Sequence, residues 1–166
     1  MNEKTLICTG HRPKGFAWNY YDKTCYEHKK YLDELKRIVG EFVKQGYTRF
    51  ISGGALGADL DFAETVLLYK EVNPNILLEI AVPCADQAGR WSNADKKRYD
   101  TILSRADEVN VLSERYTPWC MHARNRYMVD KSDAVLAIWN GKQEGGTFQT
   151  LTYAKKKGKH TVILSI

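Results

Sequence analysis

Short apolar segments alternate along the chain with segments in which apolar residues recur every third or fourth position. The first kind, typical of buried strands, covers residues 5–9, 49–52, 76–82, 108–112, 133–139 and 160–164. The second kind, typical of helices with one apolar face, lies near residues 31–43, 57–71, 95–106, 118–131 and 146–158. This alternation predicts an α/β fold: a Rossmann-like, doubly wound sheet of about six mostly parallel strands, with helices on both faces.

Size and composition fit one globular unit. The chain has 166 residues, of which 43% are hydrophobic and 27% charged, which excludes intrinsic disorder and fibrous repeats. The four cysteines are dispersed without a Cys-x-x-Cys pair, so neither a disulfide framework nor a metal site is expected. No apolar run approaches the roughly 18 residues of a membrane span, and the start lacks a signal-peptide core. The sequence predicts a cytoplasmic protein with a single domain over residues 1–166 and no membrane partner.

The positive charge is concentrated in the second half of the chain. The net charge is +5, and residues 84–166 hold 14 basic and 9 acidic side chains. Much of the excess is the lysine cluster at 155–159. These lysines suit the negative end of a helix dipole; the alternative is a weak attraction for an anion such as a nucleotide. Lys96, Lys97 and Arg98 are expected on a solvated helix face.

Three of the predicted strands end in turns that contain glycine. They are Gly10-His11-Arg12-Pro13, the stretch from Ser52 to Asp59, and the stretch from Asn140 to Thr147. In an open parallel sheet, ligands bind at the carboxyl ends of the strands, next to the switch point. We therefore expect all three turns to lie at one edge of the sheet.

Two of these turns lead into helices and could bind phosphate. Glycines let the backbone approach a ligand closely, and the amides that begin a helix attract anions. In Ser52-Gly53-Gly54-Ala55-Leu56-Gly57-Ala58-Asp59 the same glycines would also serve a tight structural turn. The Asn140–Thr147 turn ends in Gly145, Gly146 and Thr147, where Thr147 is either a ligand contact or an N-cap.

Side chains near these turns add charge and a possible stacking surface. Arg12 could pair with phosphate oxygens or form a surface ion pair, and His11 could be a ligand contact or an exposed loop residue. Trp139 is the tryptophan best placed to stack on a base, although most tryptophans are packing residues. Asp59 and Asp61 fit helix N-terminal caps, and Asp59 could instead accept a ribose hydroxyl.

Longer motifs resemble known families. Residues 121–128 (Met-His-Ala-Arg-Asn-Arg-Tyr-Met), with Ser132-Asp133-Ala134 and Gly145-Gly146-Thr147, are similar to motifs of the Lonely Guy nucleotide phosphoribohydrolases. The Ser52–Asp59 stretch resembles a run of the DNA-processing protein A family. Both families belong to the Rossmann-like SLOG superfamily, and Thr9–Pro13 together with Ser52–Asp59 is most similar to its YpsA branch, a domain of unknown function. The resemblance implies a nucleotide site and, as in many relatives, a homodimer.

The chain departs from the phosphoribohydrolase pattern where catalysis depends on it. Arg124 matches the family's catalytic arginine, but the position of the catalytic glutamate is Thr150, and position 125 is asparagine where the family has lysine. Cleavage of an N-glycosidic bond also needs a carboxylate. Glu144 or Asp59 could replace the missing glutamate.

The sequence leaves three functions open. The first is binding, and through it sensing, of a nucleotide or a ribose-phosphate derivative such as an ADP-ribose-like molecule. In this case the phosphate would lie between Gly53–Asp59 and Gly145–Thr147, and no cofactor would be required. The second is hydrolysis of a nucleotide N-glycosidic bond. The third, single-stranded DNA binding, is least favoured because the net charge is small. The residues expected to bind the ligand are Gly10, His11, Arg12, Ser52, Gly53, Gly54, Gly57, Ala58, Asp59, Arg124, Gly145, Gly146 and Thr147.

Overall fold

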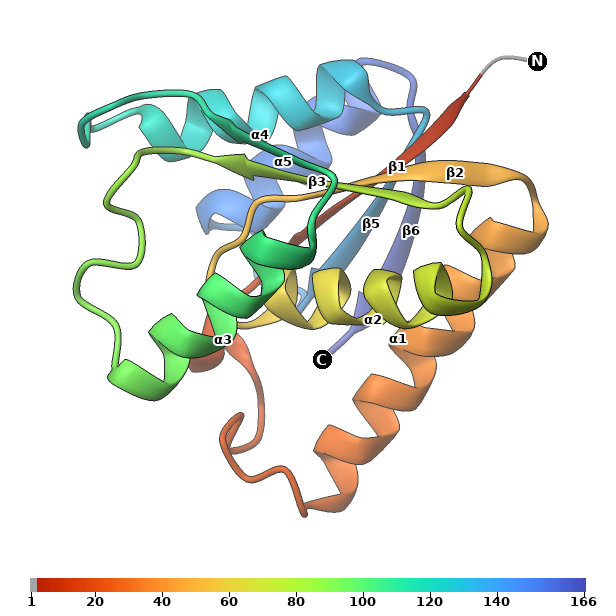
Figure 1. Cartoon of the computed structure of the whole chain (residues 1–166), viewed down its shortest axis with the longest axis horizontal. Helices are drawn as coiled ribbons and strands as arrows, with labels where there is room; N and C mark the ends of the chain where they lie inside the picture. The colour runs from red at the N-terminus through yellow and green to blue at the C-terminus, as the bar shows by residue number, and fades with distance from the viewer. Residues whose placement is uncertain (1–2) are drawn as a thin grey trace.

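A computed structural model describes residues 3–166 as a six-stranded sheet flanked by five helices (Figure 1). The strands are β1 (Lys4–Gly10), β2 (Tyr47–Ser52), β3 (Leu77–Val82), β4 (Glu108–Val111), β5 (Ala134–Trp139) and β6 (His160–Ser165). The helices are α1 (Tyr26–Lys44), α2 (Ala58–Val72), α3 (Asn93–Arg105), α4 (Cys120–Lys131) and α5 (Gly145–Lys156), and a short 3-10 turn covers Pro13–Gly15. The predicted α/β class and the predicted number of strands are confirmed.

The sheet is parallel throughout and has the order β4-β3-β2-β1-β5-β6. From β1 the chain builds the sheet towards β4 on one side, then crosses back to place β5 on the other side of β1. The register pairs Gly10 at the end of β1 with Ile138 near the end of β5. The switch point of this doubly wound sheet therefore lies between the carboxyl ends of β1 and β5, where α/β proteins of this kind bind ligands.

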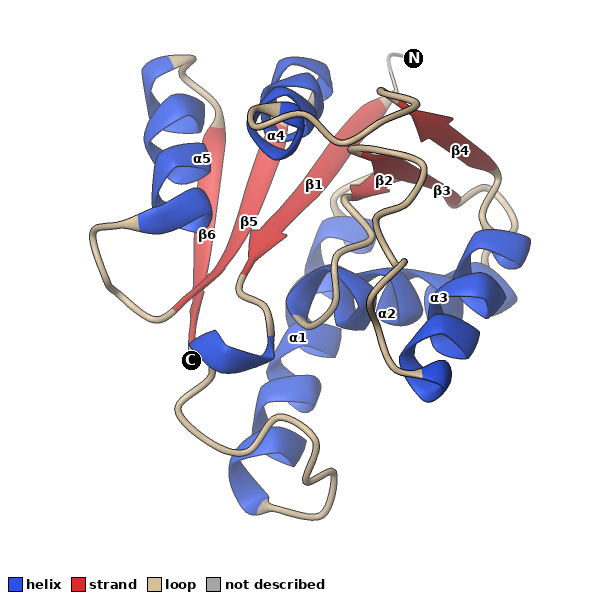
Figure 2. Cartoon of the chain, turned by 90° about the vertical axis from the view of Figure 1, so that its left-hand side faces the viewer, coloured by secondary structure: helices blue, strands red, loops and turns tan. Residues whose placement is uncertain are grey.

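Each face of the sheet is covered by its own set of helices. Figure 2 shows α4 and α5 on one side and α1, α2 and α3 on the other. Alternate residues of β1 serve the two sides: Leu6 and Cys8 pack with α1–α3, whereas Ile7 packs with Met128 of α4 and Ala154 of α5. Burial on both sides explains why β5 is apolar throughout instead of alternating.

Within residues 3–166, every helix is too short or too polar to cross a bilayer.

Candidate ligand-binding cleft

A cleft of about 430 Å³ opens at the carboxyl ends of β1 and β5. Its walls come from the end of β1 and the following loop, the starts of α2 and α5, and one side of α4. The residues that line it are Cys8, Thr9, Gly10, His11, Arg12, Lys14, Gly15, Ala55, Asp59, Met121, Arg124, Asn125, Met128, Gly146 and Thr147. The three glycine-containing turns thus meet at one edge of the sheet.

The predicted ligand residues divide into two groups. Those that line the cleft are Gly10, His11, Arg12, Asp59, Arg124, Gly146 and Thr147. Those that do not line it are Ser52, Gly53, Gly54, Gly57, Ala58 and Gly145. Sequence reasoning missed Met121, Asn125 and Met128, although all three stand in the motif around Arg124, at a spacing that places them on one side of a helix.

The turn after β2 uses several of its amides inside the protein. The Gly54 N–H donates to Ser52 Oγ (3.2 Å), the Ala55 N–H to Asp59 Oδ2 (3.2 Å), and the Ala58 N–H to the His11 carbonyl (3.0 Å). The expectation that these amides are available to a phosphate is wrong, because each already has an acceptor. Gly54, Ala55 and Ala58 therefore offer no free amide to a ligand in the cleft.

Arg124 is held in the wall of the cleft by backbone carbonyls. Its side chain is buried, and Nη1 donates to the Gly53 carbonyl (2.5 Å) and the Ala81 carbonyl (3.4 Å). Its Nε donates to Asn125 Oδ1 (2.8 Å). Burial lowers the pKa of Arg124, and the negative charge of Asp59 opposes that shift. These contacts fix the guanidinium and join α4 to the ends of β2 and β3.

Asp59 is the carboxylate that lines the cleft, and no other residue of the lining within 3–166 is acidic. It is 5% exposed, and burial raises its pKa while the charge of Arg124 opposes the rise. A buried carboxyl group with a raised pKa takes up a proton more readily than an exposed one. Asp59 can therefore accept a hydrogen bond from a hydroxyl group, or donate one when protonated.

The start of α5 supplies the free anion-attracting end of a helix. Its N-cap is Glu144, so the predicted N-cap role of Thr147 is wrong. A Cβ atom built on Gly146 would meet only Asn125 Nδ2, at 3.9 Å, which shows that the space beside this glycine is open. Arg12 also lines the cleft, is exposed and forms no ion pair within residues 3–166.

His11 and Trp139 differ in their access to the cleft. His11 lines it, burial lowers the pKa of His11, and its Nε2 is buried with no hydrogen-bond partner in the described part of the chain. The Trp139 ring is stacked on Phe148 at 6.0 Å between centroids, and its Nε1 donates to the Lys142 carbonyl (2.9 Å). Trp139 is a packing residue, so the base-stacking role considered for it has no support in its position.

Thr150, the position of the resembled family's catalytic glutamate, and Glu144, one candidate replacement, both lie outside the cleft. Glu144 is exposed and does not line it. Thr150 is buried, and its Oγ1 donates to the Gly146 carbonyl within the helix (2.7 Å). Of the two replacements suggested by the sequence, only Asp59 reaches the cleft.

Residues 3–166 contain no group of three histidine, cysteine, aspartate or glutamate side chains that could hold a metal ion.

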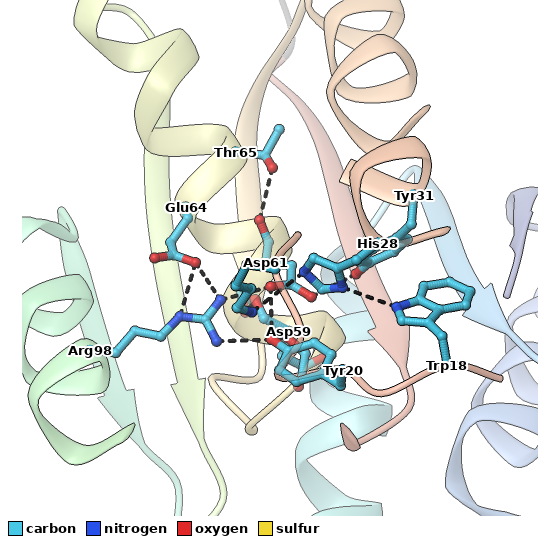
Figure 3. A network of polar contacts seen from close by, with 12 residues as sticks. Trp18, Tyr20, His28, Tyr31, Asp59, Asp61, Glu64, Thr65 and Arg98 are labelled. Atoms are coloured by element: carbon cyan, nitrogen blue, oxygen red, sulfur yellow. Dashed lines mark hydrogen bonds and ion pairs between the residues drawn. The ribbon is translucent and has the colours of Figure 1, made fainter. Parts of the chain in front are cut away.

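A buried carboxylate anchors the loop that follows β1. Asp61 of α2 is 3% exposed and accepts hydrogen bonds from Tyr20 (2.8 Å), Tyr31 (2.8 Å) and Arg98 (2.7 Å), as Figure 3 shows. Tyr20 belongs to the loop that carries His11, so the network fixes that loop to α2 and α3. Asp61 is therefore not a helix cap and Arg98 is not on a solvated face, which corrects both predictions.

The family model described as "YspA SLOG family" (YpsA) matches residues 6–165 of the chain. The chain belongs to the YpsA family. Among its YpsA-like relatives, the SPbeta prophage-derived protein YoqJ of Bacillus subtilis is 35% identical over 140 residues, covering 76% of this chain and 81% of YoqJ. A UPF0398 protein of Halalkalibacterium halodurans is 32% identical over 159 residues, covering 93% of this chain and 82% of the relative. The predicted family resemblance is confirmed.

A solved structure has a similar fold. The X-ray structure of TM1055, a structural genomics target, superposes with a TM-score of 0.55 at 16% sequence identity, covering 95% of this chain and 72% of TM1055. At that level of identity the likeness concerns the fold alone.

Proposed function

We propose that this protein binds a nucleotide or a ribose-phosphate derivative in the cleft at the carboxyl end of β1, beside the start of α5. The observation that carries the proposal is that the start of α5 and the side chain of Arg12 meet at one cleft on the switch point of the sheet. Helix N-termini attract anions through their unpaired amides and the positive end of the helix dipole. A guanidinium adds charge-assisted hydrogen bonds to the same phosphate.

The rest of the cleft suits a nucleoside better than a free phosphate. Met121 and Met128 offer apolar surface, and Asp59 and Asn125 offer polar groups for hydroxyls or a base edge. The volume of about 430 Å³ falls in the range of small-molecule sites, roughly 300–1,000 Å³. Phosphate contacts alone give weak affinity after binding costs of several kcal/mol, so the nucleoside contacts are needed for useful binding.

Calorimetric titration with AMP, ADP, ADP-ribose and ribose 5-phosphate tests the proposal. We expect AMP to bind, and Arg12→Gln to weaken its affinity about tenfold or more because one charge-assisted interaction is lost. Arg115→Gln is the matched control, since Arg115 is exposed, carries the same charge and does not line the cleft. The proposal fails if no compound of the panel binds at millimolar concentration.

The position of Asp59 favours a second candidate function, hydrolysis of a nucleotide N-glycosidic bond. In that reaction water adds across the bond, releasing the free base and ribose 5-phosphate, and Asp59 would activate the water or stabilise the reacting sugar. Release of base from nucleoside monophosphates, followed by chromatography, measures it. Asp59→Asn should abolish release, while Glu144→Gln should leave it unchanged because Glu144 lies outside the cleft. Absence of any released base with the wild type rejects this function and leaves binding.

A further inference from the structure

A second hollow of about 470 Å³ runs along the seam between α4 and α5, beside the cleft. We call it the α4–α5 groove; its charged and aromatic lining consists of His122 and Arg126 of α4 and of Phe148, Tyr153, Lys156 and Lys157. Asn125 connects the two regions, because it lines both the cleft and the small depression that adjoins the groove. A ligand held in the cleft could therefore extend over Asn125 into the groove.

The α4–α5 groove is strongly basic. No acidic residue of the described chain lines it, and Asp130, next to it, accepts a hydrogen bond from Tyr153 (2.6 Å). Within residues 3–166, Arg126, Lys156 and Lys157 form no ion pair, whereas Arg49 and Arg98 elsewhere on the molecule are paired with carboxylates. Unpaired positive charge collected in a concave surface favours an anionic ligand.

Arg126 is held in one orientation with its terminal nitrogens free. Its Nε donates to His122 Nε2 (2.9 Å), and its guanidinium carbon lies 4.7 Å from the centre of the Tyr153 ring. Neither Nη1 nor Nη2 has a hydrogen-bond partner in the part of the chain that the structure describes. A guanidinium that is already oriented loses little conformational freedom when it binds a phosphate, so this arrangement is suited to an oxyanion.

We propose that the α4–α5 groove binds a second phosphate of the same ligand, and that this ligand is a nucleotide with two separated phosphates. The inference rests on the proposed function, since the first phosphate is the one placed at the start of α5. Tyr153 lies about two turns, or ~10 Å, along α5 from Gly146. That separation is too long for the directly linked phosphates of a pyrophosphate. Phosphates on opposite sides of one ribose, or successive phosphates of a short oligonucleotide, are farther apart than those of a pyrophosphate and come closer to this span.

Calorimetry on the full chain with three probes tests the inference: AMP, adenosine 3′,5′-bisphosphate and the dinucleotide pApA. We expect at least one of the two bisphosphorylated probes to bind about tenfold or more tightly than AMP. Arg126→Gln should remove this gain and leave AMP affinity unchanged. Lys155→Gln, which removes one exposed charge of α5 outside the groove, should leave every affinity unchanged. A gain shared by both probes identifies a small bisphosphate, and a gain with pApA alone identifies an oligonucleotide.

The outcomes separate this inference from the proposed function. Equal affinities for AMP and both other probes overturn the second site, as does an equal effect of Arg126→Gln and Lys155→Gln. Failure of the proposed function has a different signature: AMP does not bind at all, and Arg12→Gln changes no affinity. Melting curves check that each variant is folded. We expect both variants to melt like the wild type, because Arg126 and Lys155 are exposed.

Discussion

Arg124 of α4 and Asp59 of α2 both lie against Gly53, the residue that follows β2. A Cβ atom built on Gly53 would lie 2.5 Å from Arg124 Nη1 and 2.7 Å from Asp59 Oδ2. Glycine is required here because two side chains fill the space beside its Cα atom. The same two side chains line the cleft. The close approach at Gly53 therefore packs α2 and α4 against the end of β2 and fixes the positions of two side chains of the site.

Gly53→Ala should destabilise the protein by about 1–3 kcal/mol, because the new methyl group displaces two buried, hydrogen-bonded side chains. Gly146→Ala is the control, since a Cβ atom there would meet only Asn125 Nδ2, at 3.9 Å. Urea unfolding followed by circular dichroism measures both free energies. Equal stability of the two variants would show that Arg124 and Asp59 are not fixed against Gly53.

Ser52→Ala should cost about 1–3 kcal/mol of unfolding free energy. The buried Ser52 Oγ accepts from the Gly54 N–H (3.2 Å) and donates to the Asp59 carbonyl (2.7 Å), and the variant leaves both backbone groups without this partner. Ser104→Ala, on the exposed side of α3, is the control and should change stability by less than about 0.5 kcal/mol. AMP affinity should be unchanged in the folded Ser52 variant, because Ser52 does not line the cleft; a large loss of affinity would restore its ligand role.

Asp61→Ala should be more damaging, with a loss of about 3–5 kcal/mol. It removes the acceptor of two buried tyrosine hydroxyls and one partner of Arg98. Thermal and urea unfolding measure the loss, and limited proteolysis should show faster cleavage between residues 11 and 25, the loop that Tyr20 anchors. Glu41→Ala removes an exposed carboxylate on α1 and should change neither the stability nor the rate of cleavage in this loop. An Asp61 variant as stable as the Glu41 variant would contradict the anchoring role.

The raised pKa of Asp59 predicts a pH dependence of stability. Burial raises this pKa above its ordinary value of 3.8, so the folded state holds the proton more tightly than the unfolded state. Such a group favours folding at low pH, and its contribution is lost as the pH rises through the folded pKa. The unfolding free energy of the wild type should therefore fall relative to Asp59→Asn as the pH rises above about 4.

Asp107 provides a control of opposite sign for the same titration. Burial raises its pKa, but hydrogen bonds from Lys70 and the Leu78 N–H outweigh burial and leave the pKa below 3.8. Its contribution to stability is present above the unfolded pKa and is lost as the pH falls. Relative to Asp107→Asn, the wild type should gain stability as the pH rises towards about 4. The same trend for both variants would contradict the assigned shift of Asp59.

Much of the fold follows from local patterns in the sequence. The apolar run at residues 133–139 corresponds to β5, Ala134–Trp139, and the pattern near 146–158 to α5, Gly145–Lys156. Each predicted strand and helix is present, with ends shifted by a few residues. Local periodicity is sufficient for this, because it records which side of each element is buried. The parallel sheet that the alternation predicts places the carboxyl ends of the strands, and with them the three glycine-containing turns, at one edge.

The roles of polar residues could not be read in the same way. Asp61 has the sequence context of a helix cap, yet its partner Tyr20 lies 41 positions away. The amides of the turn after β2 resemble a phosphate site, yet three of them donate to acceptors within the protein, one of which is the carbonyl of His11. Sequence spacing indicates which groups are available for hydrogen bonds and leaves open which of them are already used.

The sequence by itself determined the type and order of the elements, the parallel sheet, and the edge at which the three glycine-containing turns meet. The tertiary structure decided which of those turns keeps free donors, which carboxylate reaches the cleft and which arginines remain unpaired. A donor or acceptor can satisfy only a limited number of partners, and the partner is chosen by contacts between distant segments, such as the one between Arg124 and Gly53, 71 positions apart.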